Sequence, residues 1–241
     1  RTLLNSGDAA GALIELRKAQ DAKAPEDQVV PDIARALLAT GDGAKLIGEF
    51  GDKTLASTPA MAELKTLLAT AYAAQGAMQN AREATAQALR AQPGHAAAVV
   101  LNARLDASTG QLDAALRQLD EVLARDAGHE GAGLLKGEIL RQARNDPDAA
   151  LALFSHVRTA HPKSLPAHAA VVGLLLQQNK LAEARSDFAA LHKLGPKHPE
   201  VLILQVQLAL ADKDFKAARE TADRLKSLSA KASWTCRIST S

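Results

Sequence analysis

The chain has 241 residues, of which 47% are apolar and 23% are charged, and its formal net charge is +2. This composition excludes a disordered chain, and the small net charge argues against nucleic acid as the main partner, because helical readers of RNA need a basic groove and stacking side chains. The most apolar stretch, 201–211, is interrupted by Gln205 and Gln207 and falls short of the roughly 18 residues of a membrane span.

The first segment, 1–25, is expected to be a half repeat in which 7–19 carries the second helix of a pair. Because the chain starts at Arg1 inside this pattern, without an initiator methionine, we expect it to be a fragment. Any signal sequence or anchor would then lie upstream.

Gly7 opens a Gly-x-x-x-x-Ala motif that recurs every 34 or 35 residues. Its clearest copies are 76–81 and 110–115, and Gly41 belongs to the same series. Later copies keep the alanine and replace the glycine, and they lie at 145–150, 179–184 and 213–218. The period predicts a repeat protein.

Each period predicts a helix, a tight turn, a second helix and a joint. Glycine tolerates positive φ where the first helix stops, and a proline such as Pro93 or Pro162 ends the second helix. The alanine is expected at the close crossing of the two helices, where a methyl group fits and larger groups do not.

The period divides residues 1–228 into a half repeat and six full repeats. The half repeat covers 1–25, and the repeats lie near 27–60, 61–94, 95–128, 129–163, 164–197 and 198–228. The second helix of 27–60 is the least regular. Thr58 is expected to cap the next helix, with Pro59 as its first residue.

The tail, 229–241, leaves the repeat pattern. It either opens a capping helix, in which Trp234 covers the apolar end of the last repeat, or is foreign to the natural chain. Cys236 is the single cysteine, so it cannot form an internal disulfide.

These features resemble the tetratricopeptide repeat (TPR), which implies an all-α, right-handed α-solenoid of stacked antiparallel helix pairs. The resemblance covers nearly the whole chain. In its register the first helix has a small and a large position, and the second helix an aromatic one. The small positions are Ala69, Ala103 and Gly137; the large ones are Tyr72, Leu140 and Leu175; the aromatic slot holds Phe154 and Phe188, replaced elsewhere by Leu16, Thr85 and Leu119.

Residues 29–55 resemble a narrower family, the TPR-repeat lipoproteins of PEP-CTERM/exosortase systems. The similarity rests on Pro31 followed by Ala-Arg-Ala-Leu-Leu at 34–38, on the loop 51–55, and on 7–19. This resemblance implies a bacterial envelope protein on the periplasmic face, encoded with exopolysaccharide production and protein sorting. It also implies a lipid anchor on an upstream cysteine, which Cys236 cannot be.

Side chains with catalytic or metal-binding chemistry are sparse. His95, His129 and His198 fall at the same joint, which indicates either a metal or acid-base ladder or, as we favour, a duplicated loop. Residues one repeat apart lie about 10 Å apart, too far to share an ion. The 51–54 loop lacks the upstream glycine of a phosphate loop. We therefore expect no enzyme, no cofactor and no metal site.

The first helices of such an array line a concave groove, which is the expected partner site. Register places one row a single position after the small residue and a second row three positions further on. From these rows we select Arg35, Thr70, Arg104, Glu138, Arg141, Leu176, Gln207 and Leu210. The best candidate patch is Arg104, Glu138 and Arg141, unless these charges merely pair with each other. The rows lack the repeated Asn and Lys that grip a peptide carboxylate.

Two functions remain open. The first is a non-enzymatic scaffold that binds a protein or peptide in its groove, in envelope polysaccharide assembly or secretion. The second is a structural spacer or polysaccharide-export module without a dedicated ligand. Aromatic residues make up only 2% of the chain, which weighs against direct glycan binding.

Overall fold

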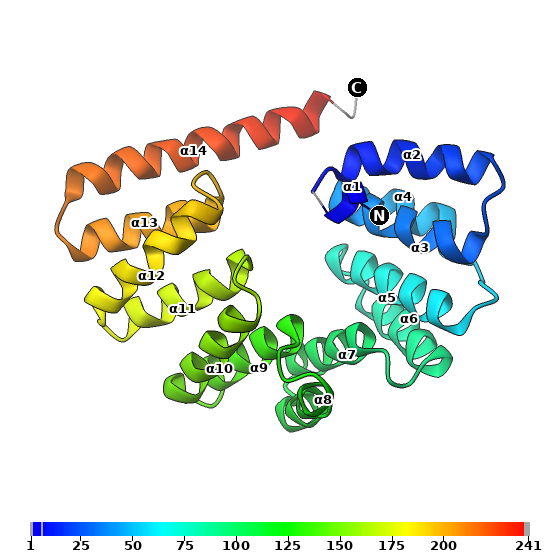
Figure 1. Cartoon of the computed structure of the whole chain (residues 1–241), viewed down its shortest axis with the longest axis horizontal. Helices are drawn as coiled ribbons and strands as arrows, with labels where there is room; N and C mark the ends of the chain where they lie inside the picture. The colour runs from blue at the N-terminus through cyan, green and yellow to red at the C-terminus, as the bar shows by residue number, and fades with distance from the viewer. Residues whose placement is uncertain (1, 6, 239–241) are drawn as a thin grey trace. The chain divides into compact units, whose positions relative to one another are not determined.

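The computed structural model describes the backbone of residues 2–5 and 7–238 and the side chains of 3–4 and 7–228. Over these residues the chain is all α, without a strand (Figure 1). The helices are α1 (Thr2–Asn5), α2 (Ala9–Asp21), α3 (Glu26–Ala39), α4 (Gly43–Phe50), α5 (Thr58–Ala74), α6 (Met78–Ala91), α7 (Ala96–Ser108), α8 (Leu112–Arg125), α9 (Glu130–Gln142), α10 (Pro147–Ala160), α11 (Leu165–Gln177), α12 (Leu181–Leu194), α13 (Pro199–Ala211) and α14 (Phe215–Ile238).

The chain divides into two compact units, Arg1–Arg125 and Asp126–Ser241. In each unit consecutive helices pack as pairs, such as α5 with α6 and α11 with α12. The first helix of a pair also contacts the first helix of the next, so that α3, α5 and α7 form one row and α9, α11 and α13 another. Each unit is therefore a stack of helix pairs. One pair lies in each stretch expected to be a full repeat; the boundaries of a single 1–228 array stay a prediction.

The turn inside each pair keeps a left-handed residue even where glycine has been replaced. Gly76 and Gly110 have φ of 75° and 81°. At the equivalent turns Asn145, Asn179 and Lys213 have φ of 51°, 57° and 59°. Asparagine tolerates this region better than most residues with a Cβ, whereas lysine adopts it at a cost. The positive φ of the turn therefore recurs in every pair, whereas the glycine does not.

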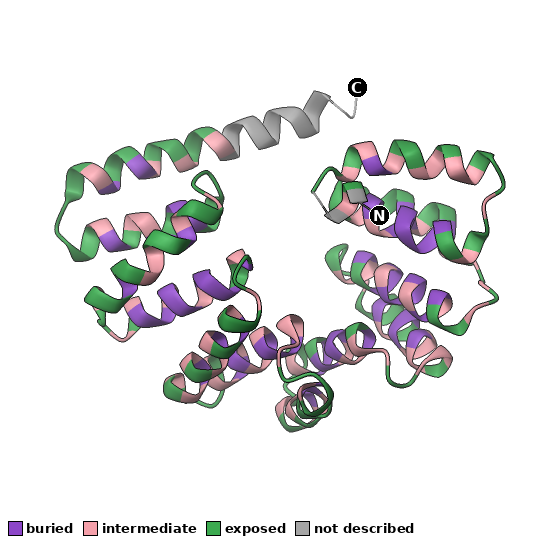
Figure 2. Ribbon diagram, in the orientation of Figure 1, coloured by how far each residue is buried: buried purple, intermediate pink, exposed green. Residues whose placement is uncertain are grey.

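The alanine of the motif is buried wherever it occurs. Ala81, Ala115, Ala150 and Ala184 have no exposed surface, and the copies in α2 and α14 are nearly as buried. Buried residues run along the faces where paired helices meet (Figure 2). This burial agrees with the expected close crossing, where a methyl group fits and larger groups do not.

The aromatic position of the second helix explains why Gly137 lies in the middle of α9. A Cβ on Gly137 of α9 would lie 2.3 Å from Cε1 of Phe154 in α10. Phe154 itself is only 2% exposed. The aromatic ring of the second helix thus fills the space that a side chain on the first helix would need.

The irregular repeat near 27–60 has a short second helix, the eight-residue α4.

The prediction that Thr58 caps the next helix, α5, is wrong by one residue. Ser57 is the N-cap, with its Oγ accepting from the amide of Ala60 at 3.4 Å, and Thr58 is already helical. The Asp27 carboxylate accepts the amides of Ala56 and Ser57 at 3.0 and 2.9 Å, which fixes the preceding loop and shifts the cap.

The backbone of the expected tail continues α14 without a break to Ile238. Side chains beyond Leu228 lie outside the described residues, and so do the expectations for Trp234 and Cys236.

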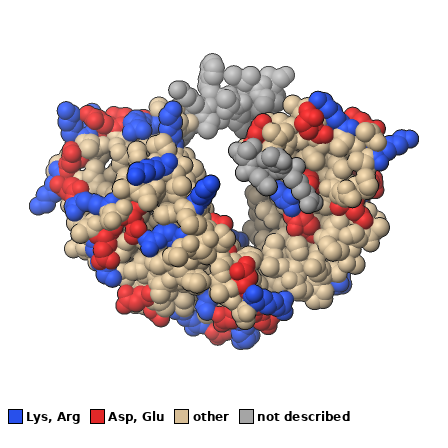
Figure 3. Space-filling model, in the orientation of Figure 1, with Lys and Arg blue, Asp and Glu red and all other residues tan. Residues whose placement is uncertain are grey.

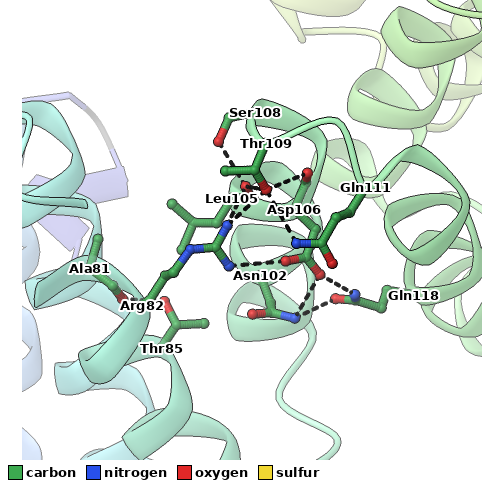
Figure 4. Close-up of polar contacts among 10 residues, drawn as sticks. All are labelled: Ala81, Arg82, Thr85, Asn102, Leu105, Asp106, Ser108, Thr109, Gln111 and Gln118. Carbon is green, nitrogen blue, oxygen red and sulfur yellow. Dashed lines mark hydrogen bonds and ion pairs between the residues drawn. The ribbon is translucent and has the colours of Figure 1, made fainter. Parts of the chain in front are cut away.

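Polar side chains connect consecutive repeats at the end of a first helix (Figure 4). Arg82 of α6 donates to the Leu105 carbonyl at 2.9 Å, to Thr109 Oγ1 at 3.0 Å and to the Asp106 carboxylate at 3.1 Å. The guanidinium thereby satisfies a carbonyl at the end of α7. In the second unit Arg185 binds Asp212 across the same interval of 27 residues. These links fix how one pair stacks on the next.

Candidate functional site

The second unit contains a groove of about 880 Å³ across the row α9, α11 and α13. Four of the residues selected from the sequence line it. The lining consists of Glu138, Arg141, Phe154, Ala169, Ala170, Gly173, Leu174, Leu176, Gln177, Asn179, Leu181, Glu200, Ile203, Leu204, Gln207 and Ala211. First helices supply most of these residues, as expected for the inner face of a repeat array.

Small residues on α11 line the middle of the groove. Ala169, Ala170 and Gly173 project little from the helix. A Cβ on Gly173 would lie 3.7 Å from Cδ2 of Leu204, which is an ordinary contact, so nothing forces glycine here. The effect of these small residues is to leave the groove open between α9 and α13.

On α9 the groove carries a neutralised ion pair. Arg141 donates to both carboxylate oxygens of Glu138, from Nε at 3.0 Å and from Nη2 at 2.6 Å. This hydrogen bonding raises the pKa of Arg141 above its ordinary value. A third donor, Nη1, reaches Gln177 Oε1 of α11 at 3.1 Å. The pair is fixed in place and offers little net charge to a ligand.

On α13 the groove is apolar and acidic. Ile203 keeps 44% of its surface exposed although it is a large apolar residue. Glu200, one turn earlier, is exposed and lines the same groove. Leu210 is 48% exposed on this helix but lies outside the lining. Sequence reasoning missed Ile203 and Glu200, although Ile203 lies four positions before Gln207 and so shares its helix face.

The remaining selected residues belong to the first unit. Arg104 is exposed on α7, and Thr70 is exposed on α5 with its Oγ1 donating to the Thr66 carbonyl at 2.9 Å. The candidate patch is thus divided between the units. Within it, the alternative that the charges pair with each other applies to Glu138 and Arg141.

Arg35 is engaged in an internal network. Its guanidinium donates to Asp32 and to Glu63 of α5, each at 2.6 Å. The other Glu63 oxygen, Oε2, lies 3.2 Å from His95 Nε2. His95, followed by Arg35, lowers the pKa of Glu63 to about 2. The network connects three consecutive repeats.

The joint histidines act as helix caps. Nδ1 of His129 accepts from the amide of Ala132 at 3.2 Å, and Nδ1 of His198 accepts from the amide of Glu200 at 3.3 Å. His95 begins α7 in the same way, without the side-chain bond. Their common position at the N-cap of a first helix is what a duplicated loop predicts. Among the described residues no three His, Cys, Asp or Glu side chains form a possible metal site.

Charges of both signs are interspersed over the visible surface of the two units (Figure 3). Across the described part of the chain, no helix has the length and apolar character needed to cross a bilayer.

Family models for the tetratricopeptide repeat match two parts of the sequence. One model matches residues 32–96 and 174–233, which together make up more than half of the chain, and a second matches 72–139. The chain belongs to the tetratricopeptide repeat family. No curated protein sequence matches it significantly.

Solved structures share the fold at low sequence identity. A structure titled as a functional characterisation of Pseudomonas aeruginosa pilF is 17% identical, with a TM-score of 0.62 over 89% of this chain and 93% of that one. PilW, described as a widely conserved type IV pilus biogenesis factor, is 17% identical, with a TM-score of 0.60 over 69% and 76%. The Cut9-Hcn1 complex of the APC/C gives 14% identity and a TM-score of 0.76 over 95% of this chain and 45% of that one. These likenesses show the all-α repeat fold alone.

Proposed function

We propose that this protein is a non-enzymatic scaffold that binds a protein or peptide in the groove of its first helices. The observation that carries the proposal is the 880 Å³ groove of the second unit, in which Ile203 is left 44% exposed. Inner faces of helical repeats bind extended peptides and partner helices, and an exposed apolar side chain in a groove favours such binding.

The finer proposal places the scaffold in the bacterial cell envelope. It would act on the periplasmic face in exopolysaccharide production and protein sorting of the PEP-CTERM type, attached by a lipid anchor upstream of the present sequence. Its support is the resemblance of 29–55 and 7–19 to that lipoprotein family. The description of one structural neighbour, PilW, as a type IV pilus biogenesis factor agrees with an envelope setting.

A structural spacer without a dedicated ligand is the second candidate. It is favoured by the charges of the inner faces that bind within the molecule, namely Arg35 with Glu63 and Arg141 with Glu138. A spacer needs rigid stacking, which such bonds supply, and needs no free groove.

Affinity capture from a bacterial envelope extract tests the scaffold against the spacer. The chain, its Ile203→Asp variant and its Ile14→Asp variant would serve as baits. Ile14 is a matched control because it is 59% exposed on α2 of the first unit, outside the groove. A scaffold should capture the same protein with the chain and with Ile14→Asp, and lose it with Ile203→Asp. Absent capture would favour the spacer, and capture that is equal with all three baits would contradict binding in this groove.

The same assay tests the candidate patch. Arg104→Glu should weaken capture and leave the circular dichroism unchanged, because Arg104 is exposed and its reversal changes only surface charge. Equal capture by this variant would remove Arg104 from the interface.

A further inference from the structure

The residues that line the groove of the second unit indicate which kind of peptide it binds. Resting on the proposed scaffold function, we propose that it selects an extended peptide with apolar side chains and one lysine or arginine. The charge of the lining, its apolar surface and its side-chain amides each favour this ligand.

The lining of the groove contains one carboxylate more than it contains cations. Its lining contains three charged residues, Glu138, Arg141 and Glu200. The first two neutralise each other through paired hydrogen bonds. Glu200 is exposed at the start of α13, and its backbone amide is already bound to His198. The lining therefore has a net charge of −1, which attracts a cationic side chain and repels an acidic peptide terminus.

The apolar part of the groove lies one helical turn from that carboxylate. Ile203 is 44% exposed and supplies most of the apolar surface there, because Leu176 is partly buried and Leu204 is only 6% exposed. Covering such surface contributes roughly 25 cal/mol per Å². The small residues Ala169 and Gly173 lie in between and let a bound backbone approach α11. An apolar side chain near a basic one thus matches the lining.

The amides of the groove favour an extended ligand over a helix. Asn179 and Gln207 bring amide groups to the lining, and Gln177 adds its amide N–H groups, because its oxygen already accepts from Arg141. A helix has already satisfied its own backbone N–H and C=O groups, whereas an extended peptide presents them for bonding. The groove crosses two interhelical spacings of about 8–10 Å each, and an extended chain rises about 3.3 Å per residue. About five or six residues therefore span it.

Panning a random octapeptide phage library on the whole chain tests the ligand class. We expect enrichment of peptides with Leu, Ile, Val or Phe near a Lys or Arg, and depletion of Asp and Glu. An enriched sequence would then be made as a labelled peptide, alongside a copy with its basic residue changed to Glu. Fluorescence anisotropy should show that the acidic copy binds more weakly.

Substitutions inside and outside the groove distinguish specific peptide binding from non-specific binding. Glu200→Gln should weaken the basic peptide about two- to fivefold, the effect of an exposed ion pair. Ile203→Asp should weaken it about tenfold, as expected for loss of a buried aliphatic contact. Ile14→Asp and Glu220→Gln, an exposed carboxylate of α14 outside the groove, should bind like the parent chain. Circular dichroism of every variant checks that the helices are retained.

Three results would overturn the proposal: enrichment of acidic peptides, equal affinity for the basic and acidic copies, or no enrichment that depends on Ile203. These failures are distinct from failure of the scaffold itself. If envelope capture depends on Ile203 while the library shows no basic and apolar preference, the scaffold stands and this ligand class is wrong. If neither assay depends on Ile203, both are wrong.

Discussion

Ala115 shows how strictly a single repeat position is constrained. It is fully buried in α8, which packs against α7, and its place in the repeat assigns it to the crossing of the two helices. Ala115→Phe should lower the free energy of unfolding by roughly 1–3 kcal/mol, because the added ring must push two packed helices apart. Urea unfolding followed by circular dichroism would measure it. Ala124→Phe, at an exposed position of the same helix, is the control and should change stability little. Equal effects at both positions would contradict the assigned crossing.

Glu63 gives the first unit an acid-sensitive contact. Its pKa falls from an ordinary 4.5 to about 2 through His95 and Arg35. A depressed carboxyl pKa contributes stability that is present above the unfolded pKa and is lost as the pH falls through the folded one. The contribution should therefore decline between about pH 5 and 2, by at most about 3 kcal/mol and less after solvent screening. The stability difference between the chain and Glu63→Gln should shrink over that range; a constant difference would contradict the network.

At the scale of elements, replacing glycine by alanine should have opposite effects on stability in a turn and in a helix. Gly110 has φ of 81° and Gly48 lies within α4, and a Cβ would meet open space at either. Gly110→Ala should destabilise by about 1 kcal/mol, since a residue with a Cβ is strained there. Gly48→Ala should stabilise by about 0.5–1 kcal/mol, because alanine favours helix. Thermal unfolding of the two variants compares them, and shifts of the same sign would contradict the turn geometry.

The elements also show what sequence can and cannot predict. The turns at Asn145 and Lys213 follow from the period, because spacing alone marks where a helix must reverse. The engagement of Arg35 by Glu63 could not be foreseen, since it depends on how one helix pair stacks on the next. The exposure of Ile203 could not be foreseen either, because helical periodicity reports a face of a helix without saying what covers it. The turns and four of the groove residues were thus predictable, whereas the internal pairing of Arg35 and the exposure of Ile203 were not.

At the scale of the whole molecule, a destabilising substitution should affect mainly the repeats next to it. Gly137→Ala forces a Cβ against the Phe154 ring and should cost about 1–3 kcal/mol. In an array where each repeat contacts its neighbours, the loss should concentrate near the change. Hydrogen exchange with mass spectrometry should show faster exchange in α9 and α10 and unchanged exchange in α5 and α6. Equal acceleration in all four helices would show that the chain unfolds as one block.

The polar links between repeats also bear on how the chain reaches its fold. Arg82 reaches Thr109 across 27 residues, and Arg141 reaches Gln177 across 36. Bonds of this kind close only short loops, so little chain entropy is lost before they form. A helix pair can therefore serve as a starting point, and its neighbours can join it in turn. The refolding rate should then depend on the speed of adding one pair to the next, with little influence from the total number of repeats.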